Sequence, residues 1–324
     1  MALCWPGTVL PEQRPRVARV VIALVIATTI SEEGRDEWRA IFAKHGWVDG
    51  RNLALSFELI RRPPKSEVEA RVREIIASRP DAILMLASAE IALFKRLTKD
   101  IPFVFYNGGT DPARLGLVES LRRPGGNITG TSLHMDRIWA KAWAMLKEIH
   151  PAMKRGGVLR DLEDHDRYPN EDWSRFDSAH REDMQATASR LGIEIRDVFI
   201  PKGATLVMAM DAIRKSKSEA LRIEVDWTKF PGLIASLEKA RILTCGFTPA
   251  FVRDGGLLAF TFDFEEGQKQ AVAIVARILR GESPATIPIY ESARYHVAVN
   301  LRTARAMGFT IPASIRIQAT EVIE

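Results

Sequence analysis

The chain has 324 residues, of which 46% are hydrophobic and 27% charged, with a formal net charge of +5. These ordinary globular values argue against collagen, coiled coil or wholesale disorder, and the length suggests two domains. Two cysteines are too few for a disulfide scaffold or a cysteine-rich zinc site, and the interspersed charges favour a solvated surface over a nucleic-acid-binding patch.

The longest apolar run covers residues 20–30. It is too short for a transmembrane helix, which needs about twenty residues. Three arginines precede it, so the core of a secretion signal is one interpretation. A buried parallel strand is favoured, because Ser31 can cap a helix directly after the run. Residues 1–15 are then expected to form a loose N-terminal arm.

Strand and helix patterns alternate along the first third of the chain. Apolar strand patterns occur at 20–28, 53–59, 82–87 and 102–106, each followed by a helical or loop segment. Such alternation is typical of a parallel sheet covered by helices on both faces. The segment 123–127 is dense in turn-forming residues and interrupts the pattern, so we place a domain crossing just after it.

The same alternation starts again after the interruption. A helix at 136–149 is followed by strand patterns at 157–160, 193–200, 220–225 and 242–246, with helices between them. A strand at 257–260, a helix capped by Asp263 and a strand at 295–299 complete the pattern. The chain therefore predicts two α/β units of similar size.

Catalytic and metal-binding signatures are missing from the sequence. It has no G-x-S-x-G elbow, Walker A loop, H-E-x-x-H or G-x-G-x-x-G, and its six histidines show no ligand spacing. Residues 161–166 form the one dense polar cluster with a histidine, for which a solvated loop is favoured over a loose metal site. We therefore expect no enzyme activity, no metal and no cofactor.

Candidate ligand-binding residues follow the predicted strands, where open α/β sheets bind their ligands. Small residues there let backbone N–H groups approach an anion closely. Two further candidates are placed beside the crossings between units. The candidates are Ser88, Ala89, Asn107 and Asp111 in the first unit, Asp161, Asp226 and Phe247 in the second, and Thr131 and Asp263 beside the crossings.

Several of these candidates have a purely structural alternative. Ser88 is equally compatible with a helix cap, and Asn107 with a simple turn. Asp226 can either meet a ligand ammonium or cap the following helix. For Asp263 a capping role is favoured, because Glu266 completes a capping box with it.

Four segments together resemble one family of proteins. Residues 123–130 read RPGGNITG, and residues 45–53 read HGWVDGRNL. Residues 111–118 begin with Asp-Pro and end with Gly-Leu-Val, and residues 299–312 read VNLRTARAMGFTIP. In this order and spacing they are similar to motifs of the ABC-transporter substrate-binding proteins that include tryptophan- and tyrosine-binding lipoproteins.

The resemblance implies a type I periplasmic-binding-protein fold. This is an α/β fold of two Rossmann-like lobes with parallel sheets, between which the chain crosses three times. The expected division is an N-terminal arm at 1–15, a first lobe at 16–130 plus 258–288, and a second lobe at 131–257 plus 289–324.

The resemblance also implies a function. The protein would be the solute-binding component of an ABC importer, closing its cleft on a small polar molecule such as an amino acid. Its partners would be this ligand and a membrane permease with its ATPase, and no nucleic acid. Members are periplasmic, but no clear signal peptide is visible, so a cytoplasmic protein or a misassigned start stays open. The alternative function is an intracellular small-molecule sensor or regulator on the same fold.

Overall fold

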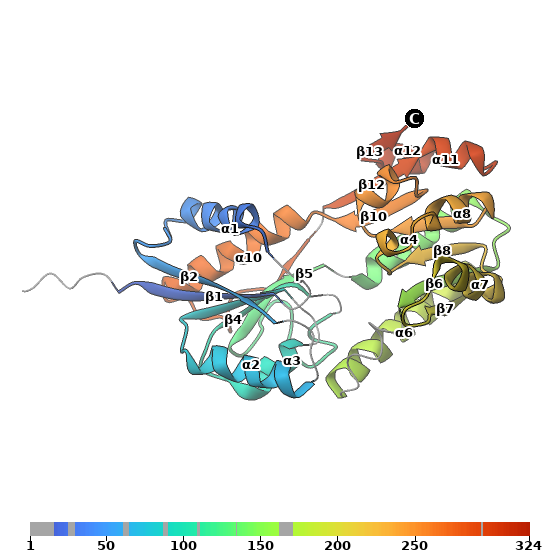
Figure 1. Ribbon diagram of the computed structural model, residues 1–324. Coiled ribbons are helices and arrows are strands. Elements are labelled where there is room, and N and C mark those ends of the chain that lie inside the picture. Colours follow the sequence, from blue (N-terminus) through green and yellow to red (C-terminus); the bar gives the residue numbers. More distant parts are fainter. Residues whose placement is uncertain are drawn as a thin grey trace, which may run out of the picture.

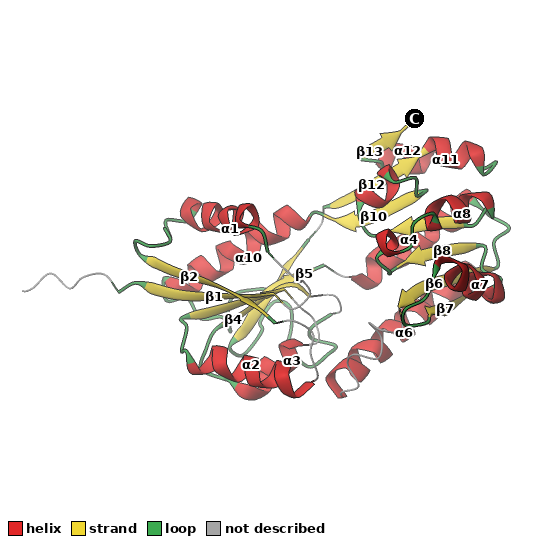
Figure 2. Ribbon diagram, in the orientation of Figure 1, coloured by secondary structure: helices red, strands yellow, loops and turns green. Residues whose placement is uncertain are grey.

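The structure is a computed structural model that describes residues 16–24, 30–60, 65–86, 90–108, 111–133, 135–161, 171–292 and 294–324. The chain forms two α/β lobes that lie side by side, each built on one twisted sheet with helices on both faces (Figures 1 and 2). This confirms the predicted α/β fold class.

The sheet of the first lobe has six strands, and every paired neighbour is parallel. Parallel strands covered on both faces are uniformly apolar, as the buried residues of β1 show. In sheet order the strands are β11 (Tyr290–Glu291), β5 (Ile128–Ser132), β4 (Phe103–Gly108), β3 (Ala82–Leu86), β1 (Ala18–Leu24) and β2 (Leu53–Leu59).

Four helices cover this sheet, two on each face. Alternate residues of β1 point to opposite faces, so Ile22 packs with α1 and α10, whereas Val21 packs with α2 and α3. The predicted cap of the first helix is confirmed, because Ser31 Oγ accepts a hydrogen bond from the Gly34 N–H at 3.2 Å. The helices are α1 (Glu32–Lys44), α2 (Lys65–Ala77), α3 (Glu90–Leu97) and α10 (Phe264–Leu279).

The sheet of the second lobe has seven strands. All its pairs are parallel except that of β10 with β12. In sheet order the strands are β13 (Glu321–Ile323), β12 (Tyr295–Asn300), β10 (Leu258–Phe262), β9 (Leu243–Gly246), β8 (Ala220–Ile223), β6 (Arg155–Asp161) and β7 (Glu194–Ile200).

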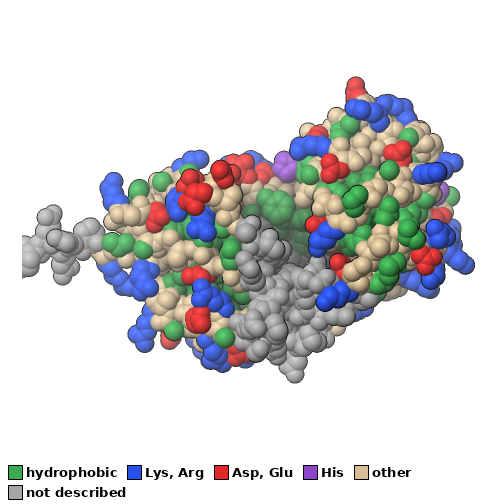
Figure 3. All heavy atoms as spheres, in the orientation of Figure 1, with side chains coloured by type: hydrophobic (Ala, Val, Ile, Leu, Met, Phe, Trp, Pro, Cys, Tyr) green, Lys and Arg blue, Asp and Glu red, His purple; other side chains and the backbone are tan. Residues whose placement is uncertain are grey.

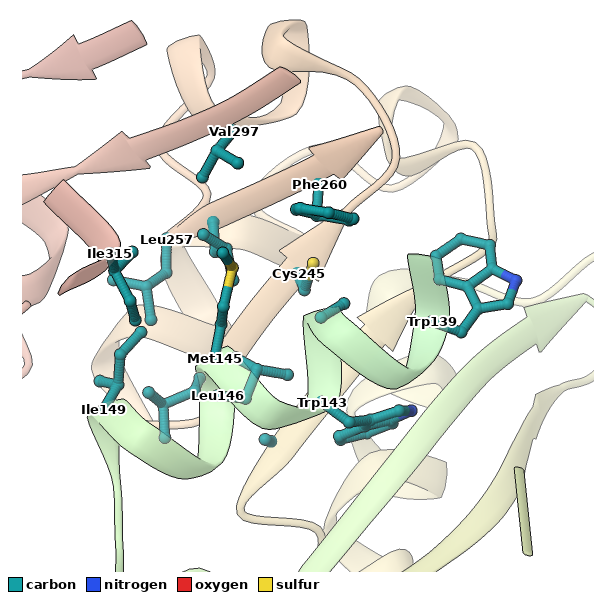
Figure 4. Packing of buried hydrophobic residues seen from close by; sticks show 14 of the residues in the cluster. Trp139, Trp143, Met145, Leu146, Ile149, Cys245, Leu257, Phe260, Val297 and Ile315 are labelled. Atoms are coloured by element: carbon teal, nitrogen blue, oxygen red, sulfur yellow. The ribbon is translucent and has the colours of Figure 1, made fainter. Parts of the chain in front are cut away.

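Helices also cover both faces of the second sheet. One face packs against α4, whose Trp143 is fully buried together with Leu146 and Cys245 (Figure 4). The opposite face packs against α7, α8 and α9. The helices are α4 (Met135–Ile149), α6 (Glu171–Leu191), α7 (Leu206–Ser216), the 3-10 helix η1 (Trp227–Lys229), α8 (Leu233–Lys239), α9 (Pro249–Arg253), α11 (Leu301–Ala306) and α12 (Ala313–Gln318).

The chain passes between the two sheets three times, as predicted, but at different residues from those expected. It crosses after β5, after β10 and after β11. The predicted boundary at 258 assigned β10 to the first lobe, whereas β10 pairs with β9 and β12 of the second sheet. The boundaries at 130 and 289 are also displaced, because β5 extends to Ser132 and β11 joins the first sheet. An apolar strand has the same pattern in either sheet, so the sequence alone could not assign it.

The segment before the first crossing depends on two glycines. Gly125 has a φ of +80°, a left-handed conformation that favours glycine, in the Pro-Gly-Gly-Asn turn. Gly130 lies in β5 opposite Phe105 of β4, and a Cβ placed on it would be 2.1 Å from the Phe105 carbonyl oxygen. Both glycines therefore serve the path of the chain into the crossing.

Candidate functional site

The candidate residues of the first lobe are only partly described. Ser88 and Ala89 lie outside the described residues, and Asn107 is placed in β4 without its side chain. Asp111 Oδ1 accepts a hydrogen bond from the Ala113 N–H at 2.8 Å and so holds the turn that follows β4. Thr131 is fully buried in β5, next to β11. Among the candidates of the first lobe, Asp111 and Thr131 are therefore the ones whose side chains the structure describes.

Two candidates of the second lobe, Asp161 and Asp226, lie at the end of a strand and at the start of a helix. Asp161 is the last residue of β6, one position earlier in the structure than the loop in which the sequence placed it. Asp226 Oδ1 accepts hydrogen bonds from the Thr228 N–H at 3.1 Å and the Thr228 hydroxyl at 2.6 Å, so this carboxylate caps η1. The capping alternative for Asp226 is therefore what the structure shows.

Phe247 is the candidate that the structure brings together with other aromatic residues. Its ring centroid lies 5.5 Å from Trp139, 5.6 Å from Phe262 and 5.7 Å from Phe264. We call these four residues the aromatic cluster. Trp139 lies in the first turns of α4, while Phe262 ends β10 and Phe264 begins α10. The cluster therefore stands at two of the three crossings, on the side of the second lobe that faces the first.

The aromatic cluster reaches the surface at Phe264, whereas Trp139 and Phe262 are buried, and it contacts the first lobe. Phe264 is 39% exposed, and hydrophobic side chains are visible in the hollow between the lobes (Figure 3). The Tyr106 hydroxyl of β4 donates a hydrogen bond to the Phe264 carbonyl at 2.7 Å, and Trp38 packs edge-on against the Tyr106 ring. A buried aromatic side chain of the first lobe thus bonds to the backbone at the second crossing, next to the aromatic cluster.

Polar residues surround the second and third crossings. Asp263 Oδ1 accepts from the Glu266 N–H at 2.9 Å, which confirms its predicted cap of α10. Asp263 also lies 3.9 Å from His296 Nε2. The Tyr290 hydroxyl donates to Glu266 at 2.5 Å, and burial together with this hydrogen bond raises the pKa of Tyr290 to about 12. These contacts join the two crossings into one hinge region.

Arg114 connects the lobes away from the hinge. It follows the Asp111 turn of the first lobe, and its Nη1 lies 2.6 Å from Asp183 Oδ1 on α6 of the second lobe. Its Nη2 donates to Glu182 on the same helix. The cleft is therefore bounded by the crossings on one side and by the Arg114 contact with α6 on the other.

A buried arginine lies beneath the aromatic cluster. Arg222 of β8 is 1% exposed, and its guanidinium carbon lies 3.7 Å from the centroid of the Trp139 ring. Its Nη2 forms an ion pair with Glu224 and lies 3.2 Å from His180 Nε2 on α6. Burial lowers the pKa of Arg222. Sequence reasoning missed this residue, although a charge inside a predicted buried strand was a visible signal.

The described residues contain no cluster that could hold a metal ion. No group of three or more His, Cys, Asp or Glu residues could hold a metal within the part of the chain that the structure describes. Asp164, His165 and Asp166 lie outside that part. Burial raises the pKa of the Cys245 thiol to about 12, so this thiol stays protonated and is a poor nucleophile. No described helix is long and apolar enough to cross a membrane.

Comparison with known proteins gives consistent matches. The family model for ABC transporter substrate binding proteins matches residues 31–323. A tyrosine-binding protein of Clostridioides difficile is 25% identical over 277 residues, which cover 81% of this chain and 72% of that protein.

Two solved structures show the same arrangement of lobes. An ABC domain from Streptococcus pneumoniae in complex with L-Trp has a TM-score of 0.72 and 22% identity, and the match covers 94% of this chain and 99% of that one. A candidate LacI transcriptional regulator from Bacteroides fragilis has a TM-score of 0.62 and 10% identity, with coverage of 87% and 96%.

Proposed function

The chain belongs to the ABC transporter substrate-binding protein family, and on that premise we propose that it captures a small polar molecule, an amino acid or a similar solute, between its lobes for an importer. Its fold is that of the type I periplasmic binding proteins. The family consists of solute-binding proteins, not enzymes. The observation that carries the proposal is the aromatic cluster around Phe247, which lines the inter-lobe hollow beside two crossings.

The proposed ligand carries an apolar or aromatic part. Small-molecule sites are concave and mostly apolar, with a few polar groups that fix orientation. The aromatic cluster supplies the apolar wall, and β4 and β6 end at the carboxyl edges of their sheets, where open α/β sheets bind ligands. The relatives named for tyrosine and L-Trp support an aromatic solute for this chain. We also propose that Asp111, Asp161 and Phe247 face this ligand.

The two lobes are proposed to move as units during binding. Lobe 1 would comprise residues 16–132 and 263–292, and lobe 2 residues 135–262 and 294–324. Only three crossings join them, so a small rotation in the hinge region changes the width of the cleft. Ligand contacts to both lobes would stabilise the closed form. The loaded protein then delivers the solute, outside the cytoplasm, to an ABC permease that is driven by its ATPase, and no covalent bond of the solute is made or broken.

A thermal-shift screen tests the proposed function. The purified chain is heated with amino acids, aromatic acids, nucleosides, sugars and polyols, each at millimolar concentration. A ligand at a hundred times its Kd should stabilise the native protein by about 2.7 kcal/mol, which corresponds to a rise in Tm of roughly 5 °C. If no solute in the panel raises the Tm, the proposed function is wrong. A solute-dependent chemical turnover would contradict the absence of catalysis.

Arg114 should favour the closed arrangement of the lobes. In Arg114→Ala, the contacts with Asp183 and Glu182 are lost. Exposed ion pairs contribute about 0.2–1 kcal/mol each, so we expect the closed fraction of the ligand-free protein to fall about two- to tenfold. Fluorescence energy transfer between dyes on the two lobes measures this fraction. Arg71→Ala is the control, because Arg71 pairs with Glu58 and Glu74 inside lobe 1. Equal transfer in both variants would show that Arg114 has no such role.

A further inference from the structure

A small cavity in the second lobe contains hydrogen-bond donors that have no acceptor. It lies between α4, α6 and β8, and its lining includes Trp139, Trp143, His180 and Arg222. Nε and Nη1 of Arg222 have no hydrogen-bond partner among the described residues, and neither has Nε1 of Trp143. All three atoms are buried. Guanidinium and indole nitrogens can only donate hydrogen bonds, so these three atoms need an acceptor that the described residues lining the cavity do not place within bonding distance.

Leaving buried donors unpaired is costly, and native proteins rarely do so without a functional reason. The cost is greatest for a charged group, and Arg222 is 1% exposed. Its ion pair with Glu224 and its contact with His180 both involve Nη2, so they leave the other two nitrogens unsatisfied. The missing partner should therefore be an acceptor, and a negatively charged one would bind best.

The position of the cavity relates it to the inter-lobe cleft. Trp139 covers the Arg222 guanidinium with one face of its ring and contacts Phe247 of the aromatic cluster. Trp143 projects from α4 one turn further from the cleft, and the nitrogen atoms of the two indoles point to the same side (Figure 4). A ligand whose ring lies against the aromatic cluster would thus bring a short side group toward these donors.

We infer that the solute of this protein carries a carboxylate, which enters this cavity and accepts hydrogen bonds from Arg222 and Trp143. This inference rests on the proposed function and specifies the chemical class of its ligand as an aromatic carboxylic acid. The described carboxylates near the cavity already have arginine partners, since Glu224 pairs with Arg222 and Asp183 with Arg114. The described residues that line the cavity therefore favour an anionic group of the ligand, and none of their carboxylates is left to bind an ammonium group.

Entry of the carboxylate requires a small opening of the lobe. The cavity measures about 10 Å³, which is room for about one water-sized group. Its α6 wall includes Asp183, the residue that Arg114 of the first lobe holds. Separation of the lobes releases this contact, so α6 can move away from Trp139 when the cleft is open and return when it closes.

The test compares an acid with its neutral amide on the full chain. Indole-3-acetate and indole-3-acetamide have the same ring and nearly the same shape, and only the acid is charged. We expect the acid to bind the wild-type protein at least tenfold more tightly in calorimetry and to raise its Tm by several degrees. Equal affinities for acid and amide would overturn the inference.

Two variants identify the residues responsible. Arg222→Met keeps the side-chain volume and should abolish the preference for the acid. Trp143→Phe removes only the N–H and should weaken acid binding about three- to tenfold. Trp47→Phe is the matched control, because its buried Nε1 also lacks a described partner but lies in the first lobe, and it should bind like wild type. If Arg222→Met does not fold, unchanged acid binding by Trp143→Phe still overturns the inference.

Two further experiments distinguish a free anion from a ligand carboxylate and cover the case in which neither indole compound binds. If chloride alone raises the Tm as much as the acid and competes with it, the cavity takes a free anion and the assignment to a ligand carboxylate is wrong. If neither indole compound binds, the ligand from the solute screen is compared with its own amide or uncharged analogue. A screen ligand without a carboxylate overturns this inference and leaves the proposed function intact, whereas a screen without any ligand overturns both.

Discussion

Replacing Gly130 with alanine should destabilise the protein by roughly 3 kcal/mol or more. The new Cβ would lie 2.1 Å from the carbonyl oxygen of Phe105 and 2.8 Å from its nitrogen. Both are backbone atoms of the neighbouring strand β4, so no side-chain rotation can relieve the clash. The strands must separate at the position where β5 leads into the first crossing. Urea denaturation followed by circular dichroism measures the loss.

Gly126 provides the matched control for this substitution. It lies in the turn just before β5, but a Cβ placed on it has no neighbour within 4 Å, and its φ is not positive. The free energy of unfolding of Gly126→Ala should therefore differ from that of wild type by no more than about 0.5 kcal/mol. If Gly130→Ala is as stable as Gly126→Ala, the backbones of β4 and β5 do not lie as close together at Gly130 as the structure places them.

Replacing Phe247 with alanine should weaken ligand binding by about thirtyfold. Phe247 contacts the other three members of the aromatic cluster, so its removal opens the apolar wall of the cleft. A lost aromatic contact and its buried area together are worth about 2 kcal/mol, and each 1.4 kcal/mol is a tenfold change in Kd. Calorimetric titration with the solute that gives the largest thermal shift measures the change.

Phe309→Ala is the control for that measurement. Phe309 is also half-buried in the second lobe, where it packs against His150. The two substitutions remove similar apolar area, so both should lower the Tm of the ligand-free protein by a similar amount. Only Phe247→Ala should change the Kd. A Kd that changes equally in both variants would place the ligand elsewhere.

Local features of the fold were predictable from the sequence. Ser31 caps α1 and Asp263 caps α10 as expected, because a cap depends only on residues a few positions apart. The alternation of strands and helices likewise gave the fold class. The sheet to which β10 belongs was not predictable, since its pairing partners are chosen by contacts between distant segments.

The candidate site was predictable only in part. Phe247 was found because it follows a buried strand at the edge of the sheet where ligands bind. Its partners Trp139 and Phe264 were missed, because they come from helices that begin at the crossings and meet Phe247 only in three dimensions. Arg222 was missed because its strand is otherwise apolar, and only the packing of α4 and α6 shows what surrounds it.

The three crossings also govern the order in which the protein can be completed during its synthesis. The first sheet lacks its edge strand, and one face lacks α10, until the chain has been made as far as Glu291. The second sheet is closed by β13, which ends at Ile323. Neither sheet can therefore be completed before segments late in the sequence have been synthesised. A chain made only as far as the second crossing keeps apolar surface of both lobes exposed, because α10 and β11 are still missing from the first lobe and β12 and β13 from the second.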